Sequence, residues 1–122
     1  MEDEMRMSDI SVTGSEESLL EKTLGEIASE ISDESAGKLM EMCDVKGLRR
    51  VFSDAELMTT AECFIRCSLN VSAAARELYM NGNTMMYRLD KIKRTTGLDV
   101  RSFDEAVAFR ILYKVYRRNN RK

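Results

Sequence analysis

Apolar residues recur at intervals of three and four along much of the chain, which is the spacing of amphipathic α-helices. The first apolar stripe consists of Leu20, Leu24, Ile27 and Ile31, in a helix that we expect to begin near Ser15. Acidic residues lie off this stripe, and early ones complement the helix dipole. A second short helix is expected over about 34–43, with Leu39, Met40 and Cys43 facing inward.

The middle of the chain contains a predicted break and then a third amphipathic helix. Residues 44–53, which include Gly47, are expected to be irregular. Ser53 lies three residues before Glu56, which is the spacing of a capping box, and Asp54 is the alternative cap. The apolar face of the helix that follows consists of Leu57, Ala61, Phe64 and Ile65.

Residues 70–97 have the pattern of a short helix, a tight turn and a longer helix. Ser72 is the candidate N-cap of the short helix and Asn81 that of the longer one, which we expect to end near Thr95, before Gly97. The inward positions are Ala74, Ala75 and Leu78, then Met85, Leu89 and Ile92. This is the layout of a helix-turn-helix, although a three-helix packing unit with a solvated outer face has the same periodicity.

A last helix is expected to begin at Ser102, which forms a second capping box with Glu105, and to end near Arg118. Its inward stripe consists of Phe103, Ala106, Val107, Ile111, Leu112 and Val115. Three aromatic residues fall off the stripe and would form an association surface if exposed: Phe109, Tyr113 and Tyr116. The basic residues at its end are Arg117, Arg118, Arg121 and Lys122. These residues could contact phosphates or increase solubility. Alternatively, they could simply be there because cations are favourable at the C-terminus of a helix dipole.

Composition and charge agree with an all-α fold made of unequal halves. Proline is absent, and no run of alternating β-branched residues suggests a sheet. Residues 1–50 carry 13 acidic and 6 basic side chains, whereas residues 51–122 carry 8 acidic and 13 basic ones. This asymmetry favours a basic working half with an acidic appendage, although uneven charge also arises by chance.

We therefore predict a helix-turn-helix bundle with an N-terminal acidic helical extension. The expected parts are a disordered tail at 1–14, the acidic extension at 15–50 and the helix-turn-helix domain at 54–118. The extension has three possible roles: a dimerisation arm, a segment that docks a regulatory partner, or simple packing against the C-terminal half.

Several classes of function are disfavoured by the residue types. There is no histidine, no glycine-rich phosphate loop and no nucleophile–base pair, so we predict no enzymatic activity, no metal and no cofactor. Cys63 and Cys67 lie four residues apart on one helix face and are interpreted as small apolar residues. No apolar run is long enough to span a bilayer and nothing resembles a secretory signal, so we expect the protein in the reducing cytoplasm.

The outward face of the longer helix, over about 82–95, is the candidate DNA-reading surface, because the last helix of this motif enters the major groove. The residues predicted to contact bases are Asn81, Asn83, Thr84, Met86, Tyr87, Arg88 and Lys91. Asparagine pairs bidentately with adenine, and arginine prefers guanine. The residues predicted to contact phosphates are Ser72, Arg76, Lys93 and Arg94.

The sequence of this region resembles a known family of bacterial regulators. The segment reads NVSAAARELYMNGNTMMYRLDKIKRTTGLDV, and SFDEAVAFRILYKVY follows it. It is similar to the C-terminal domain of PucR/CdaR-type transcriptional regulators, over about 65 residues. The residues that match the family pattern are Asn70, Val71, Ser72, Ala75, Arg76, Leu78, Tyr79, Asn83, Thr84, Tyr87, Arg88, Leu89, Ile92, Thr96, Gly97, Leu98 and Asp99. The resemblance implies a Fis-like helix-turn-helix and transcriptional regulation.

The sequence departs from that family at the start of the reading helix. Asn81 and Gly82 stand where the family usually has His-Arg, and Met86 stands where it often has arginine. Gly82 and Met86 each remove a cation, and the expected consequence is weaker DNA binding, a changed sequence preference or the loss of DNA binding. Residues 1–50 are too short and too acidic for the large sensing domain that the family usually carries.

Two functions follow from these observations. The first is a sequence-specific regulator that binds double-stranded DNA as a homodimer, because one helix-turn-helix makes few base contacts. The alternative is a degenerate helix-turn-helix that modulates another regulator without binding DNA, with the acidic half as the surface for a protein partner. In a variant of this idea, the acidic half folds over the basic face and mimics DNA.

Overall fold

The computed structural model describes residues 18–119, and all its regular structure in that range is helical. The helices are α2 (Leu19–Glu30), α3 (Asp33–Glu41), α4 (Val45–Phe52), α5 (Ala55–Arg66), α6 (Val71–Glu77), α7 (Gly82–Thr96) and α8 (Phe103–Asn119). The prediction of an all-α fold is therefore confirmed. The tail predicted at 1–14, the expected helix start at Ser15, Arg121 and Lys122 lie outside the described residues.

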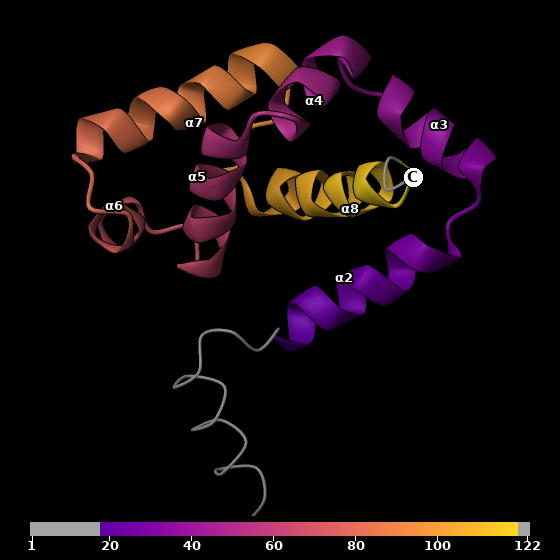
Figure 1. Ribbon diagram of the computed structural model, residues 1–122, viewed down its shortest axis with the longest axis horizontal. Coiled ribbons are helices and arrows are strands. Elements are labelled where there is room, and N and C mark those ends of the chain that lie inside the picture. The colour runs from indigo at the N-terminus through magenta and orange to yellow at the C-terminus, as the bar shows by residue number, and fades with distance from the viewer. Residues whose placement is uncertain (1–17, 120–122) are drawn as a thin grey trace, which may run out of the picture.

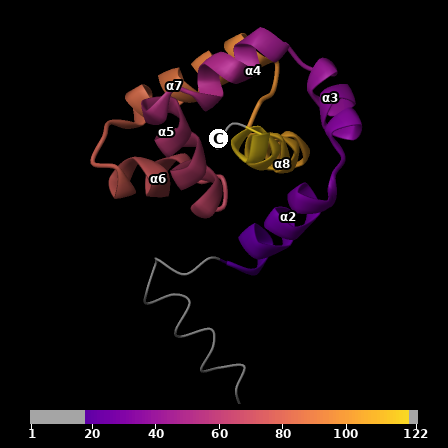
Figure 2. The same cartoon turned by 45° about the vertical axis from the view of Figure 1, so that its right-hand side comes forward.

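The helices are arranged around α8. Figure 1 shows α7, α6, α5 and α4 on one side of the molecule, with α2 and α3 completing an arc. Figure 2 shows α8 almost end-on, surrounded by the other helices. α2 and α3 both contact α8, whereas α4, α5 and α6 contact α7. The part of the acidic extension that forms α2 and α3 is thus packed against the C-terminal helix.

A polar side chain caps the start of each helix from α2 to α7. The caps are Ser18, Ser32, Asp44, Asp54, Asn70 and Asn81. Each side-chain oxygen accepts a backbone N–H of the first turn, which would otherwise lack a partner. The prediction of Asn81 as a cap is confirmed, since its Oδ1 accepts the Asn83 N–H at 2.6 Å.

Two other capping predictions, Ser72 for the short helix and the box of Ser102 with Glu105, are wrong, and for the third helix the alternative cap, Asp54, is confirmed while the box of Ser53 with Glu56 is not. Asn70 caps α6, so Ser72 lies inside the first turn of that helix. Asp54 caps α5, while the Ser53 hydroxyl donates backwards to the carbonyl oxygens of α4. The carboxylate of Glu105 accepts the Asp99 N–H instead of closing a box at the start of α8. In each of the two predicted capping boxes, a side chain makes a hydrogen bond with a different partner in the folded chain.

The predicted break over 44–53 is also wrong, because α4 occupies most of it. Leu48, Val51 and Phe52 of α4 are buried in the core. The Phe52 ring lies 5.3 Å from that of Phe109, edge to face. Gly47 indicated a break, yet it has a packing role: a Cβ there would lie 1.7 Å from the Thr95 carbonyl oxygen of α7.

The main core is formed by α4 to α8 and contains most of the predicted inward positions of α5, α6 and α7. Those that are buried are Leu57, Ala61, Phe64, Ala74, Ala75, Met85, Leu89 and Ile92. Ile65 and Leu78 are partly buried against this core. The layout of a short helix, a turn and a longer helix on a supporting helix is confirmed.

The predicted stripes of α2, α3 and α8 are partly wrong. Leu20 and Ile27 are 44% and 45% exposed, whereas Leu24 and Ala28 are buried. In α3, Ala36 is the buried residue, Met40 and Cys43 are partly buried, and Leu39 is 37% exposed. Phe103 is 67% exposed and Phe109, predicted to lie off the stripe, is fully buried. α2 and α3 pack partly through small and charged side chains such as Ala28, Ala36 and Glu21, which apolar periodicity does not register.

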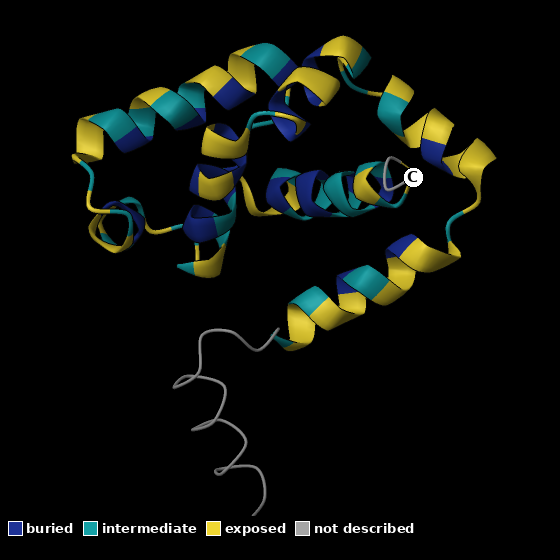
Figure 3. Cartoon of the chain, in the orientation of Figure 1, coloured by how far each residue is buried: buried dark blue, intermediate teal, exposed yellow. Residues whose placement is uncertain are grey.

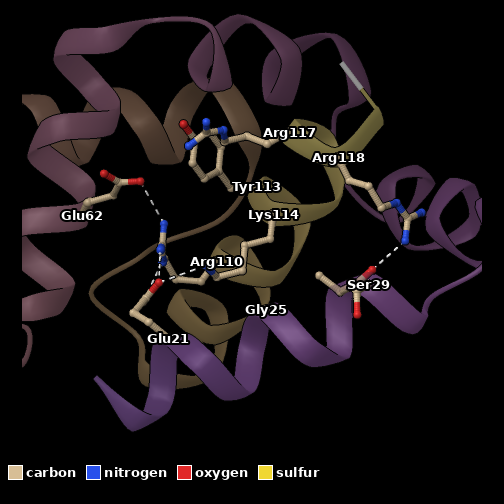
Figure 4. Close-up of a pocket in the computed structure, with 10 residues that line it drawn as sticks. Glu21, Gly25, Ser29, Glu62, Arg110, Tyr113, Lys114, Arg117 and Arg118 are labelled. Atoms are coloured by element: carbon tan, nitrogen blue, oxygen red, sulfur yellow. Dashed lines mark hydrogen bonds and ion pairs between the residues drawn. The ribbon is translucent and has the colours of Figure 1, made fainter. Parts of the chain in front are cut away.

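Arg110 of α8 is the charged centre of the seam between α2, α5 and α8 (Figure 4). It is 7% exposed and pairs with Glu21 of α2 and, at 3.1 Å, with Glu62 of α5. Lys114 also pairs with Glu21, at 3.2 Å. Burial raises the pKa of Glu21, but the hydrogen bonds and charges of Arg110 and Lys114 lower that pKa below its usual value overall.

Arg118 fastens the other end of α2 to α8. Its Nη1 donates to the carbonyl oxygens of Ala28 and Ile31, at 2.6 and 2.7 Å, and its Nη2 lies 3.3 Å from Asp33. The last carbonyls of α2 therefore have a cationic donor, which satisfies acceptors that a helix end leaves open. This basic residue at the end of α8 holds the acidic extension in place.

We predict that Arg110→Ala lowers the free energy of unfolding by about 3 kcal/mol, because it leaves Glu21 and Glu62 at the seam without their shared cation. The measurement is urea unfolding followed by circular dichroism. Arg117→Ala is the matched control, since Arg117 is exposed on the same helix, and should change stability by less than about 0.5 kcal/mol. Equal unfolding midpoints for the two variants would contradict the assignment.

We also predict that the packing of α2 weakens in acid. The folded-state pKa of Glu21 lies below its usual value of 4.5, so its stabilising contribution is present above that value. It is lost as the pH falls through the lower folded-state pKa. Unfolding midpoints measured between pH 6 and pH 3 should fall less steeply for Glu21→Gln than for the wild type, and parallel curves would exclude Glu21 as a contributor.

Candidate nucleic-acid interface

α7 has one completely buried side and one side that faces away from the other helices. Met85, Leu89, Ile92 and Thr96 are each 0% exposed. Thr96 also donates its hydroxyl to the Ile92 carbonyl oxygen at 2.8 Å. Figure 3 shows buried and exposed positions alternating along the α7 ribbon. No other helix of residues 18–119 covers the side chains on the opposite side of α7.

A tight turn connects α6 to α7 and fixes the angle between them. Leu78 ends α6, and Tyr79 follows with a left-handed φ of 54°. The Met80 N–H donates to the Ala75 carbonyl oxygen at 2.9 Å, which holds the turn closed. The Tyr79 side chain is 97% exposed. Tyr79 matched the family pattern, but nothing in the sequence indicated its positive φ.

Five of the residues predicted to contact bases lie on or near the outward side of α7. Asn81, Asn83, Tyr87 and Lys91 are exposed, and Thr84 is half-buried. The side-chain oxygen of Asn81 is already used as the helix cap. The Arg94 guanidinium lies over the Tyr87 ring, 5.8 Å from its centroid. The structure thus brings polar, aromatic and cationic groups together on one helix face.

Met86 and Arg88, the other two, lie on the flanks of α7. Met86 is half-buried and packs against the core. The Arg88 guanidinium is directed toward α5, with Nη2 3.1 Å from the Glu56 carboxylate and Nη1 3.4 Å from the Thr60 hydroxyl. Its side chain is 23% exposed, so much of it is covered by the protein. Arg88 therefore links α7 to its supporting helix in the structure.

The four residues predicted to contact phosphates lie on two helices. Ser72 and Arg76 are exposed on α6, next to the turn. Lys93 is exposed and lies 3.8 Å from Asp99, while Arg94 is exposed over Tyr87. The structure does not bring all four onto one helix face, because Lys93 points toward the loop after α7.

The acidic groups near the C-terminal end of α7 have their own cation. Arg101 pairs with Asp90 at 2.9 Å and with Asp99 at 2.8 Å. The hydrogen bond from Arg101 is the main reason that the pKa of Asp99 is lowered, so this carboxylate is charged at neutral pH. Arg101 neutralises these two carboxylates. They therefore reduce the positive potential of Lys91 and Arg94 on the outward side less than unpaired carboxylates would.

The described part of the acidic extension does not lie over the outward side of α7. α2 and α3 pack against α8, and Figures 1 and 2 place α2 across the molecule from α7. This arrangement contradicts the idea that the described part of the extension mimics DNA over the basic face. The positive groups of α8 that meet the extension are instead Arg110, Lys114 and Arg118.

The cysteines show no arrangement for a metal. Cys63 is 1% exposed, with its Sγ 3.8 Å from the Ala74 carbonyl oxygen. Burial, together with the neighbouring Cys67, raises the pKa of Cys63 to about 11, so its thiol is protonated and inert. Among residues 18–119, no group of three or more Cys, Asp or Glu is placed to hold a metal ion. Nor does the described part of the chain include a helix long and apolar enough to cross a membrane.

Known proteins give an independent comparison for the helix-turn-helix. Residues 57–115 match the model of the family described as the PucR C-terminal helix-turn-helix domain. A curated relative, the uncharacterized protein YxkF of Bacillus subtilis (strain 168), is 34% identical over 55 residues. That match covers 45% of this chain and 18% of the relative. No solved structure matches the chain.

The matched segment begins in α5 and ends in α8, so it includes the turn and the whole of α7. α2, α3 and α4 precede it. Domains of this kind belong in general to DNA-binding regulators. Residues 57–115 of this chain are therefore a PucR-type helix-turn-helix domain.

Proposed function

We propose that this protein is a sequence-specific transcriptional regulator that inserts α7 into the major groove of DNA. The observation that carries the proposal is the uncovered outward side of α7 in a chain whose residues 57–115 match a DNA-binding domain family. An α-helix fits the major groove, and the N-terminal residues of a recognition helix meet the base edges. The Asn81 cap and the buried stripe present these residues on a rigid helix.

Asn83, Thr84, Tyr87 and Lys91 are the residues that we propose to contact bases. Asn83 has both an amide donor and an acceptor, which match the edge of adenine. Thr84 offers a hydroxyl and a methyl group, and Lys91 reaches acceptors such as those of guanine. These four side chains lie at intervals of one, three and four residues, so they follow one side of the helix.

Arg88 contributes to this surface by positioning it. Its contacts with Glu56 and Thr60 hold α7 against α5 and draw the guanidinium away from the outward side. Met86 contributes through packing in the same way, because it is partly buried against the core. Both residues thereby orient the neighbouring side chains that meet the bases.

Ser72, Arg76 and Arg94 are the proposed phosphate contacts around this surface. Ser72 and Arg76 are exposed on α6, the helix that crosses the backbone in this motif. Such contacts fix the orientation of the protein on DNA and carry no sequence information themselves. A domain this small reads few bases, so we propose a homodimer on two half-sites about 34 Å apart, one helical turn of DNA.

A second candidate is a module that binds another regulator without touching DNA. Gly82 places no side chain at the start of α7, and a Cβ there would meet nothing within 4 Å. Apolar side chains that could contact a protein partner are exposed outside α7. Leu19, Met42 and Phe103 have exposed fractions of 78%, 80% and 67%. A mobility-shift assay on genomic fragments at low salt separates the two candidates, because the absence of any shift at micromolar protein would favour the second.

We predict that Asn83→Ala and Lys91→Ala each weaken DNA binding about tenfold, the loss expected for one good base contact. Both residues are exposed, so thermal unfolding should be unchanged. The measurement is fluorescence anisotropy on a DNA site selected with the wild-type protein. Asn83→Ala should in addition bind sites with a changed base almost as well as the selected site.

Lys22→Ala is the matched control, since Lys22 is an exposed lysine on α2, across the molecule from α7. It should bind the selected site like the wild type. If Lys91→Ala and Lys22→Ala had the same effect, α7 would not be the reading helix.

A further inference from the structure

α4 carries three cations that the proposed reading surface does not use. Lys46, Arg49 and Arg50 are all exposed. Within residues 18–119, none of their side chains makes a hydrogen bond or an ion pair. This differs from α8, where Arg110, Lys114 and Arg118 are paired with acidic groups. α4 also lies outside the segment that matches the helix-turn-helix family.

The packing of α4 places it directly beside the C-terminal half of α7. A Cβ at Gly47 would lie 1.7 Å from the Thr95 carbonyl oxygen, so only glycine permits this approach. The Asp44 N–H donates to the Thr96 carbonyl oxygen at 3.4 Å. Further along the chain, Glu56 at the start of α5 reaches Arg88. The order of these contacts is reversed along the two segments, so the chain from the start of α4 to the start of α5 runs antiparallel to α7 (Figures 1 and 2).

The antiparallel order puts Arg50 level with the turn of α7 that contains Lys91. On α4, Arg50 lies about 60° around the helix from Gly47, and Lys46 about 100°. Both lie on the solvent side next to the junction, since Leu48 and Val51 face the core. Arg49 lies about 160° from Gly47, on the far side of α4.

Lys91 borders the same junction from α7. It is one turn before Thr95, the residue whose carbonyl contacts Gly47, and therefore lies on the same side of α7. Arg94 is exposed beside it. Two helices thus contribute Lys46, Arg50, Lys91 and Arg94 to one stretch of surface.

We infer that the junction of α4 and α7 binds the phosphodiester backbone of DNA, with Lys46 and Arg50 as phosphate contacts. The inference rests on the proposed function of α7. A helix of 15 residues is about 22 Å long, longer than the major groove is wide at about 12 Å, so its end passes close to a phosphate strand. Unpaired lysine and arginine at that point match the charge of the strand.

This site also accounts for the missing cations at the other end of α7. Gly82 has no side chain there, and Met86 is apolar and half-buried. α4 supplies two cations near the C-terminal end of the same helix. These contacts at the end of the reading helix add to those proposed for Ser72 and Arg76 on α6, beside its start.

The test is the salt dependence of DNA binding by the full chain, measured by fluorescence anisotropy on the selected site. Each phosphate contact contributes about 0.9 to the slope of log Kd against log salt concentration. Lys46→Gln with Arg50→Gln should therefore lower the slope by about 1.8, and affinity for selected and unrelated sites should fall by the same factor. Arg49→Gln should leave the slope unchanged, although it removes an identical exposed charge from the same helix.

The charge-conserving pair Lys46→Arg with Arg50→Lys should keep the wild-type slope, which separates loss of charge from disturbed packing of α4. If the neutral double variant and Arg49→Gln shared the wild-type slope while Lys91→Ala still bound weakly, the junction would be excluded and the function of α7 would stand. If the wild-type chain bound no duplex DNA at low salt, both proposals would fall.

Discussion

α7 is held by the core along one side and is not covered by another described helix along the other, and the proposed reading of DNA requires both features. Met85, Leu89, Ile92 and Thr96 form a stripe with no exposed surface. Burial of three large apolar side chains stabilises the helix by about 2 kcal/mol each. α4, α5 and α6 all pack on that stripe, so three helices fix the direction of one. A recognition helix needs this rigidity, because misplaced side chains lose their match to the base edges.

The charge asymmetry along the sequence does not correspond to the charge exposed on the folded protein. The acidic first half and the basic second half meet at the seam between α2 and α8. There Glu21 and Asp33 are matched by Arg110, Lys114 and Arg118. Those cations stabilise the fold, so the excess of basic residues after position 50 overstates the charge that a ligand meets. Lys91, Lys46 and Arg50 have no ion pair within residues 18–119 and lie on or beside α7, and the last two belong to the nominally acidic half.

The sequence predicted the helix-turn-helix closely, because its helices pack through large apolar side chains at regular intervals. Met85, Leu89 and Ile92 are an example, and they are all completely buried. The same reasoning failed where packing depends on small or charged groups. Gly47 was interpreted as a break, although the close approach of α4 to α7 requires glycine. Similarly, α2 packs on α8 through Ala28 and an ion pair, which left Leu20 and Ile27 exposed.

The residues that could contact DNA were predictable only where helix periodicity determines which way a side chain points. Periodicity placed Asn83, Tyr87 and Lys91 outward, and they are exposed. It also placed Arg88 outward, but Glu56 and Thr60 of another helix draw its guanidinium aside. A partner that is 28 residues away along the chain, as Thr60 is from Arg88, leaves no local signal in the sequence. The cations of α4 were overlooked for a related reason, since the helix that carries them was not expected.

The central claim is that α7 reads DNA, and selection of bound sequences from a random duplex library tests it most directly. The account predicts enrichment of one short motif, repeated with twofold symmetry at a spacing of about one helical turn. Enrichment should persist when salt is raised enough to suppress nonspecific binding. A pool that remained random through successive rounds, with the folded wild-type chain, would contradict the account.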